Sequence, residues 1–286
     1  MAVLINRDTR VMIQGITGKQ GSYHSQKMTE YNVNVVAGIS PGKGGRQVHG
    51  VDVYDTVAAA KKERRIDASM IMIPPAGVLG AAVEAIENKI PLVVIVTEFV
   101  PVHDSLVIRN MARAAGVRVV GPNTIGVISP GQSKVGIMPG YIYSRGHVGI
   151  ISRSGTLTHE VSSNLTYKGI GQSTCVCIGG DPVKGTDFVD VLELFREDEQ
   201  TEAVIMIGEI GGAGEELAAR YVMENGYPKK IVAFIAGQTA PAGKKMGHAG
   251  AIVSEGFGTA KSKIDSLTKA GIGVARTLDQ LLSMVK

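Results

Sequence analysis

A histidine among glycines is the side chain of this sequence with the clearest capacity for covalent chemistry. His248 lies within Lys244-Lys245-Met246-Gly247-His248-Ala249-Gly250-Ala251-Ile252, a stretch with the composition of a loop. An imidazole with an ordinary pKa of about 6.5 is largely neutral near neutral pH and can carry a phosphoryl group. A lone histidine is more often a surface or packing residue, so the prediction depends on the groups that would serve it.

Glu209 is the predicted partner of His248. It follows the apolar run Val204-Ile205-Met206-Ile207-Gly208 and precedes Ile210-Gly211-Gly212. A carboxylate at a strand end can accept a hydrogen bond from one imidazole nitrogen, which leaves the other nitrogen to attack phosphorus. The alternative interpretation is an exposed loop glutamate.

Ser154, Gly155 and Thr156 form a candidate phosphate-binding site. They stand between a predicted strand and a predicted helix, in Ile150-Ile151-Ser152-Arg153-Ser154-Gly155-Thr156-Leu157-Thr158. Hydroxyls and N–H groups at a helix start can bind an anion. The alternative is an ordinary helix cap. The motif G-x-S-x-G is not present here, so this is not a hydrolase nucleophile turn.

Two loops near the N-terminus suit a ligand that carries phosphates. The turn Gln14-Gly15-Ile16-Thr17-Gly18-Lys19-Gln20-Gly21 precedes a predicted helix, although its glycine spacing departs from the dinucleotide fingerprint G-x-G-x-x-G and also fits a plain turn. The second predicted strand leads into Ser40-Pro41-Gly42-Lys43-Gly44-Gly45, without the acidic residue that binds the ribose of NAD. Lys43 instead suits an extra phosphate, such as the 3′-phosphate of coenzyme A. The alternative is a solvated turn lysine.

Alternating apolar runs and amphipathic segments predict the elements that hold these groups. The first half has predicted strands at 11–13, 35–39, 69–73, 93–96 and 117–120, with predicted helices near 18–31, 76–88 and 104–115. Continuous β-branched runs separated by helices are typical of a parallel sheet in a doubly wound α/β domain. The carboxyl ends of such strands line a ligand cleft, which places Pro75 and Val96 to Glu98 beside the two loops.

The second half repeats the pattern and predicts a second open α/β domain. Its predicted strands are 147–151, 174–178, 203–207 and 231–235, and its predicted helices lie near 156–167, 214–225 and 259–270. Gly, Pro and Ser residues between the halves indicate a connector. We therefore predict a first domain at 1–122, a connector at 123–145 and a second domain at 146–286.

Composition narrows the classes of partner. The net charge of +4 comes from scattered Lys and Arg residues with few aromatics, which disfavours nucleic acid. No apolar run approaches the length of about 20 residues that a membrane helix needs, and the N-terminal residues lack a signal-peptide layout. We expect a cytoplasmic protein. Cys175 and Cys177 suit neither a disulfide framework nor a zinc site, so we predict that they are small buried residues and that the chain holds no metal.

Several of these motifs, taken in order, resemble the alpha subunits of succinate–CoA ligase (succinyl-CoA synthetase). The resemblance extends nearly from end to end, and its other segments are Gly179-Gly180-Asp181-Pro182 and the His248 loop. It implies an α/β fold with open parallel sheets, in which a Rossmann-like CoA-binding domain is followed by a flavodoxin-like ligase domain. It also implies a beta subunit with an ATP-grasp nucleotide site, where ATP or GTP and Mg²⁺ bind, in an αβ or (αβ)₂ assembly.

The resemblance implies an activity and the residues that perform it. The reaction is the reversible formation of succinyl-CoA from succinate, CoA and a nucleoside triphosphate, through a phosphohistidine and succinyl phosphate. His248 would be phosphorylated, Glu209 would be its hydrogen-bond partner, and Ser154, Gly155 and Thr156 would bind the phosphate. The residues expected to contact CoA are Thr17, Gly18, Lys19, Gln20, Pro41, Lys43, Pro75, Val96, Thr97 and Glu98.

Two departures from the family pattern leave the acid substrate open. His159 stands where the family usually has tyrosine, near the carboxylate substrate, and Gly-Pro-Asn-Cys-Pro-Gly appears as Gly121-Pro122-Asn123-Thr124-Ile125-Gly126. His159 and Asn123 are therefore the candidate substrate residues, and malate or citrate is an alternative acid. Two further hypotheses are a nicotinamide oxidoreductase, which Lys43 disfavours, and a non-catalytic CoA-binding protein.

Overall fold

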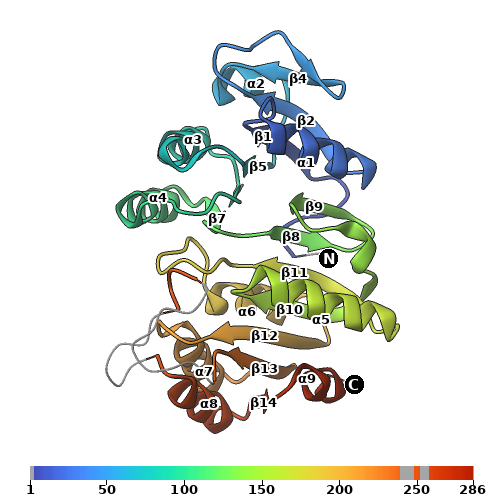
Figure 1. The fold of residues 1–286 in the computed structure, drawn as a ribbon, viewed down its shortest axis with the longest axis vertical. Coiled ribbons are helices and arrows are strands. Elements are labelled where there is room, and N and C mark those ends of the chain that lie inside the picture. Colours follow the sequence, from blue (N-terminus) through green and yellow to red (C-terminus); the bar gives the residue numbers. More distant parts are fainter. Residues whose placement is uncertain (1–2, 239–247, 252–257, 286) are drawn as a thin grey trace. The chain divides into compact units, whose positions relative to one another are not determined.

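The chain folds into two compact units. The computed structural model describes residues 3–238, 248–251 and 258–285. The N-terminal unit comprises Leu4–Met138 with Val183–Gly185, and the C-terminal unit contains Pro139–Pro182 and the described residues from Thr186 onward. Figure 1 shows both units, with helices and strands labelled where there is room. The predicted domain boundaries at residues 122 and 145 stay predictions.

A largely parallel sheet forms the centre of the N-terminal unit. Its strand order is β3-β4-β2-β1-β5-β6-β7, and only the β3–β4 pair is antiparallel. The strands are β1 (Arg10–Gln14), β2 (Asn34–Ile39), β3 (Gln47–Val48), β4 (Val51–Tyr54), β5 (Ala68–Ile71), β6 (Leu92–Ile95) and β7 (Arg118–Val120). From β4 onward this is the strand order of dinucleotide-binding domains, so the predicted Rossmann-like fold is confirmed.

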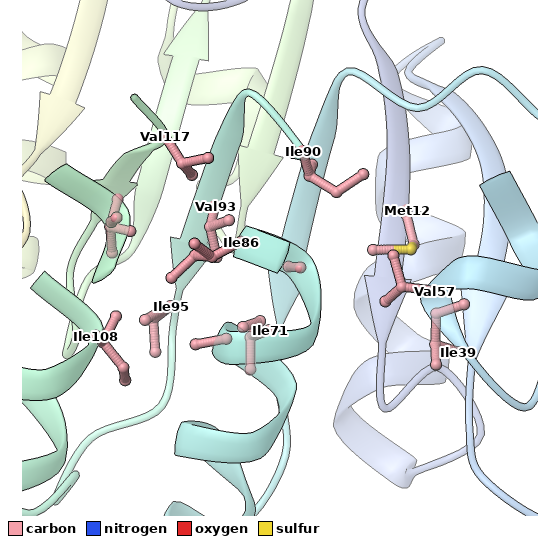
Figure 2. Close-up of a cluster of buried hydrophobic side chains, with 14 of the residues drawn as sticks. Met12, Ile39, Val57, Ile71, Ile86, Ile90, Val93, Ile95, Ile108 and Val117 are labelled. Carbon is pink, nitrogen blue, oxygen red and sulfur yellow. The ribbon is translucent and has the colours of Figure 1, made fainter. Parts of the chain in front are cut away.

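The N-terminal unit contains the helices α1 (Lys19–Glu30), α2 (Val57–Glu63), α3 (Pro75–Glu87) and α4 (Val102–Ala115). The last three bury one face of the sheet in a single apolar cluster, to which α1 contributes no residue. Figure 2 shows Ile86 and Ile108 from helices among Val93 and Ile95 of β6. The alternate residue Val94 is also fully buried, so the sheet is covered on both faces. The unit also contains an antiparallel hairpin, β8 (Gly126–Ser129) and β9 (Ser133–Gly136), within the predicted connector.

A parallel sheet also forms the centre of the C-terminal unit, with the order β14-β13-β12-β10-β11. The strands are β10 (Arg145–Ser152), β11 (Gln172–Cys177), β12 (Ala203–Glu209), β13 (Lys230–Ala236) and β14 (Gly273–Ala275). The helices are η1 (Gly140–Ile142), α5 (Gly155–Tyr167), α6 (Phe188–Glu197), α7 (Gly214–Asn225), α8 (Ala260–Lys269) and α9 (Leu278–Met284). Numbered along the chain, the strands follow the order 2-1-3-4-5 of flavodoxin-like folds, which confirms that prediction.

Every long element expected from the sequence is present, with ends shifted by only a few residues. The predicted helix at 104–115 begins instead at Val102, and the predicted strand at 147–151 extends over Arg145–Ser152. The ten-residue helix α6 was not predicted, and neither were the short elements β3, β4, α2, β8, β9, β14 and α9. Cys175 and Cys177 are free thiols and buried, as expected. Among the described residues, no helix is both long enough and apolar enough to cross a membrane.

The topology of the C-terminal sheet determines where a site can form. β10 and β12 are neighbours, with Ser152 paired to Ile207, while β11 lies on the other side of β10. The chain therefore leaves the ends of β10 and β12 in opposite directions, which opens a crevice at their carboxyl ends. Arg153 follows β10, and Glu209 ends β12. Both residues are thus placed at the position where open α/β sheets bind ligands.

Candidate active site

His248 and Glu209 are in direct contact in the C-terminal unit. Nδ1 of His248 lies 2.7 Å from Oε2 of Glu209, the hydrogen bond that the sequence analysis placed between them. Glu209 is buried, so it is not the exposed loop glutamate of the alternative interpretation. The His248 side chain is 29% exposed. Because Nδ1 is engaged by the carboxylate, the neutral ring holds its proton there, and Nε2 carries the lone pair.

The backbone after β11 supports the imidazole ring. A Cβ atom on Gly180 would lie 2.4 Å from Cγ of His248, so only glycine leaves room for the ring. The carbonyl of Gly180 accepts a hydrogen bond from the N–H of Gly250 at 3.1 Å, and the N–H of Ala251 donates to the carbonyl of His248 at 3.1 Å. The flanking residues Lys244 to Gly247 and Ile252 lie outside the described residues.

The second oxygen of Glu209 faces an arginine. Oε1 of Glu209 lies 3.1 Å from Nη2 of Arg153, and the Arg153 side chain is only 4% exposed. Removing one partner of a buried ion pair costs about 3–5 kcal/mol, so Arg153 compensates the buried Glu209 carboxylate. Arg153 belongs to a motif that the sequence analysis quoted, but its role was missed.

The surroundings of His248 favour its protonated form. The hydrogen bond that His248 donates to Glu209 is the largest influence, and it raises the pKa of His248 above its ordinary value. Burial and the Arg153 cation act in the opposite direction, while the charges of Glu209 and Asp181 reinforce the rise. When the pH is lowered, His248 therefore becomes protonated, and loses its nucleophilic lone pair, at a higher pH than an isolated histidine does.

The candidate phosphate-binding residues begin α5. Ser154 is the N-cap, and its side chain accepts a hydrogen bond from the N–H of Leu157 at 3.3 Å. The alternative interpretation of Ser154 as a helix cap is therefore correct for its side chain, and Gly155 and Thr156 are the first residues of the helix. Their N–H groups lie at the positive end of the helix dipole, which favours a bound anion. The Ser154 turn directly follows Arg153, so it lies at the same sheet edge as Glu209.

A cavity of about 450 Å³ lies at the corresponding edge of the N-terminal unit. Among the residues predicted to contact CoA, Thr17, Pro41 and Lys43 line it. The Lys43 ammonium donates to Oγ1 of Thr17 at 3.0 Å, and Thr17 donates to Oγ of Ser40 at 2.9 Å. The glycine-rich turn and the Lys43 loop are thereby joined around one opening, which is large enough for part of a small-molecule ligand.

The glycine-rich turn has the geometry that a phosphate ligand needs. Gly15 has a φ of +89°, and a Cβ atom there would lie 2.4 Å from the carbonyl oxygen of Met72. The N-cap of α1 is Gly18, which provides no side-chain cap. The first N–H groups of α1, from Lys19 and Gln20, are therefore directed toward whatever lies beyond the helix start.

The remaining residues predicted to contact CoA do not line this cavity. They are Gly18, Lys19, Gln20, Pro75, Val96, Thr97 and Glu98. Of these, Thr97 contacts the cavity lining, because its Oγ1 donates to the carbonyl of Ile73 at 2.8 Å, and Ile73 lines the cavity. The cavity also includes residues that the sequence analysis did not single out, among them Gln14, Ser40, Ile73, Gly77, Gly80, Ala81 and Glu84.

The two candidate substrate residues belong to different units. His159 lies in α5, where Nε2 is buried without a hydrogen-bond partner among the described residues and the ring meets Tyr143 edge-on at 6.4 Å between centroids. Burial lowers the pKa of His159, which favours the neutral ring. Asn123 belongs to the N-terminal unit and has a φ of +57°. In the ranges 3–238, 248–251 and 258–285, no group of His, Cys, Asp or Glu side chains is arranged to hold a metal ion.

Two family comparisons match separate parts of this chain. The CoA binding domain family matches residues 6–99, which include the lining of the N-terminal cavity. The CoA-ligase family matches residues 151–272, which include Arg153, Glu209 and His248. The two matches therefore follow the same division as the two candidate sites.

Similar proteins cover almost the whole chain. The succinate–CoA ligase (ADP-forming) subunit alpha of Aquifex aeolicus is 52% identical over 95% of this chain and 89% of its own length. The protein of the same name from Methanothermobacter thermautotrophicus is 54% identical over 94% and 91%. An ATP citrate lyase from Methanothrix soehngenii, solved with citrate and coenzyme A, is similar with a TM-score of 0.90 at 25% identity. That likeness covers 99% of this chain but only 50% of the lyase chain.

Replacing Glu209 with glutamine tests the electrostatics of the histidine. Glutamine can still accept a hydrogen bond but carries no charge, so the Arg153 cation near the ring keeps only one of its two carboxylate partners. We expect Glu209→Gln to lower the pKa of His248, as measured by an NMR titration of the histidine Cε1–H signals. The other five histidines serve as internal controls. An unchanged pKa of His248 would show that Glu209 does not set it.

Proposed function

Because this chain belongs to the succinate–CoA ligase alpha-subunit family, we propose that it forms succinyl-CoA from succinate and CoA while a nucleoside triphosphate is converted to its diphosphate and phosphate. The observation that carries the proposal is the 2.7 Å contact between His248 and Glu209, within a chain about half identical to its relatives along nearly its full length. The reaction is reversible, since each step exchanges one activated phosphoryl or acyl bond for another.

His248 is the proposed phosphoryl carrier. Its Nε2 lone pair attacks the γ-phosphorus of the nucleotide, an N–P bond forms, and the bond to the departing diphosphate oxygen breaks. Nδ1 keeps its proton throughout and donates a hydrogen bond to Glu209, so the positive charge that develops on the ring lies against a carboxylate. Succinate then takes the phosphoryl group through a carboxylate oxygen, and the N–P bond breaks. The CoA thiol gives its proton to the departing phosphate, its sulfur bonds to the acyl carbon of succinyl phosphate, and the bond from that carbon to the phosphate oxygen breaks.

Ser154, Gly155 and Thr156 are proposed to hold the phosphoryl group during transfer. They occupy the start of α5, where N–H groups without intrahelical partners meet the positive end of the helix dipole. Such a helix terminus stabilises negative charge by about 0.3–1 kcal/mol for each favourable contact. This magnitude is too small to trap the phosphoryl group, but it is enough to orient it.

The N-terminal cavity is the proposed site for part of CoA. Thr17, Pro41 and Lys43 line it, and Lys43 supplies a cation for the 3′-phosphate. Gly18, Lys19 and Gln20 would bind the pyrophosphate through the start of α1, while Pro75, Val96, Thr97 and Glu98 would contact the rest of the molecule. His159 and Asn123 are proposed to contact the acid.

A beta subunit completes the proposed enzyme, since relatives of this chain are named as alpha subunits. We propose that this partner has an ATP-grasp fold and holds the nucleotide with Mg²⁺, in an αβ or (αβ)₂ assembly. The name of the relatives specifies an ADP-forming enzyme, which favours ATP as the first nucleotide to test. We also propose the domain division at residues 1–122, 123–145 and 146–286.

Three competing functions receive less support. A malate or citrate ligase is suggested by His159 and Thr124, but the relatives about half identical to this chain carry the succinate name. A nicotinamide oxidoreductase would need an acidic side chain at the end of β2, where this chain has Ser40 and Pro41. A non-catalytic CoA-binding protein would not explain a histidine held by a buried carboxylate.

Phosphorylation of His248 tests the proposed function. With its beta subunit and ATP labelled with ³²P in the γ-phosphate, the wild-type chain should acquire an acid-labile, base-stable label. We expect His248→Asn to remove the label, because amide nitrogens are not nucleophilic, and we expect it to abolish succinyl-CoA formation. The exposed His103→Asn variant is the matched control and should label like the wild type. Labelling that survives His248→Asn would refute the proposal.

Affinity for CoA and for 3′-dephospho-CoA tests the role of Lys43. Loss of a hydrogen bond to a charged group costs about 1.5–3 kcal/mol, so Lys43→Ala should weaken CoA binding by about 10–100-fold. It should leave dephospho-CoA binding nearly unchanged, as measured by titration calorimetry on the holoenzyme. Lys62→Ala, on the exposed end of α2, is the control and should change neither affinity. An equal loss for both ligands would place Lys43 away from the 3′-phosphate.

A further inference from the structure

Behind Glu209 lies a cluster of charged side chains that the proposed mechanism does not use. Arg153, Glu215 and Lys263 come from three different segments of the C-terminal unit: the turn after β10, the first turn of α7 and the first turn of α8. Their side chains are 4%, 1% and 0% exposed, respectively. Three buried ionisable side chains in contact are unusual away from a functional site, because each must be compensated.

Lys263, Glu215, Arg153 and Glu209 form a continuous charge network, in which positive and negative side chains alternate and which ends at the catalytic histidine. Lys263 forms an ion pair with Oε2 of Glu215, and Oε1 of Glu215 lies 3.2 Å from Nη1 of Arg153. Arg153 then reaches Oε1 of Glu209 through Nη2 at 3.1 Å, and Glu209 holds Nδ1 of His248. The charges of its two cations and two carboxylates balance, so the charge network together with a neutral His248 has no net charge.

Hydrogen bonds to the backbone, in addition to the ion pairs, hold the side chains of the charge network in place. Nη1 of Arg153 donates to the carbonyl of Gly211 at 2.8 Å, and Nζ of Lys263 donates to the carbonyl of Gly212 at 3.0 Å. Oε1 of Glu215 also accepts the backbone N–H of Glu209 at 3.0 Å. The loop that carries Glu209 is therefore anchored at both ends by members of the cluster.

Space around Glu215 is also reserved for its carboxylate. A Cβ atom on Gly208 would lie 2.6 Å from both Cγ and Oε1 of Glu215, so the glycine allows Glu215 to pack against β12. Burial alone would raise the pKa of Glu215, but the Arg153 and Lys263 cations outweigh burial and lower that pKa below its ordinary value. Glu215 is thus an ionised anchor between two cations.

We propose that Arg153, Glu215 and Lys263 are positioning residues that hold the Glu209 carboxylate against Nδ1 of His248 and so keep Nε2 as the attacking nitrogen. This inference rests on the proposed phosphorylation of His248. Without Glu215, Arg153 loses its anchor and its neutralising charge, and its guanidinium is drawn onto Glu209 in competition with the histidine. Of the described residues, the charged groups that act on the ring are Glu209, Arg153 and Asp181.

Glu215→Gln in the holoenzyme tests the charge network, because it removes the negative charge of the side chain at position 215 and keeps its shape. Misplacement of a reacting group by about 1 Å can cost about 10²-fold in rate, so we expect kcat to fall by about that factor. The KM for CoA should stay unchanged. The acid limb of the kcat profile should move to lower pH, because an unbalanced Arg153 cation lowers the pKa of the imidazole. A purely structural role would not shift the pH profile.

Glu216→Gln is the matched control. Glu216 is the next residue of α7, and its Oε2 lies 3.3 Å from Nζ of Lys263. Its side chain is 20% exposed and does not belong to the charge network that leads to Glu209. It should leave both kcat and the pH profile as in the wild type. The wild-type enzyme must acquire the phosphoryl label on His248. If it does not, the proposed function is contradicted, and not the positioning role of the charge network.

A double variant covers the case in which Glu215→Gln alone does not fold. Glu215→Gln with Lys263→Met removes one carboxylate and one cation, so the remaining buried charges of Arg153 and Glu209 still balance. We expect this variant to fold, to keep the wild-type KM for CoA and to show the lowered kcat. Wild-type kcat in either variant, or an unshifted pH profile in Glu215→Gln, would overturn the inference.

Discussion

The hydrogen bond between Nδ1 of His248 and Oε2 of Glu209 is the interaction on which the rest of the site depends. At 2.7 Å it fixes the proton of the neutral ring on one nitrogen, and it places a negative charge where positive charge would develop in the phosphorylation that we propose for the other nitrogen. A carboxylate can do this only if it stays ionised in a buried position. The contact with Arg153 meets that requirement, because it stabilises the charge of Glu209 without using the oxygen that holds the histidine.

The two units place their chemistry by the same rule of sheet topology. In each, the functional side chains follow the carboxyl ends of parallel strands and lie beside the start of a helix. They differ in how that helix begins. Gly18 leaves α1 without a side-chain cap, which suits close approach of a phosphate to the backbone, whereas Ser154 caps α5 and leaves only Gly155 and Thr156 to a ligand. The N-terminal cavity is therefore suited to a bound carrier and the C-terminal edge to a transient phosphoryl group.

The sequence could predict what depends on local patterns. The long strands and helices follow continuous β-branched runs and amphipathic segments, and the pairing of His248 with Glu209 followed from motif resemblance. The short elements β3, β4 and α2 were missed, because two to seven residues do not establish a period. The roles of Arg153, Glu215 and Lys263 were not predicted, for a different reason. They are separated by 62 and 48 residues along the chain, and only the crossover topology brings them together. The cavity residues Gln14 and Glu84 were missed likewise, because a lining is a property of packed elements.

The position of the phosphoryl group on the ring tests the central claim most directly. Phosphorus NMR distinguishes a phosphohistidine that carries the group on Nε2 from one that carries it on Nδ1. The holoenzyme, phosphorylated with ATP and measured without denaturation, should show a single signal of the Nε2 isomer, because Glu209 occupies Nδ1. A signal from the Nδ1 isomer would contradict the account, since it would mean that the carboxylate does not hold that nitrogen when the ring reacts.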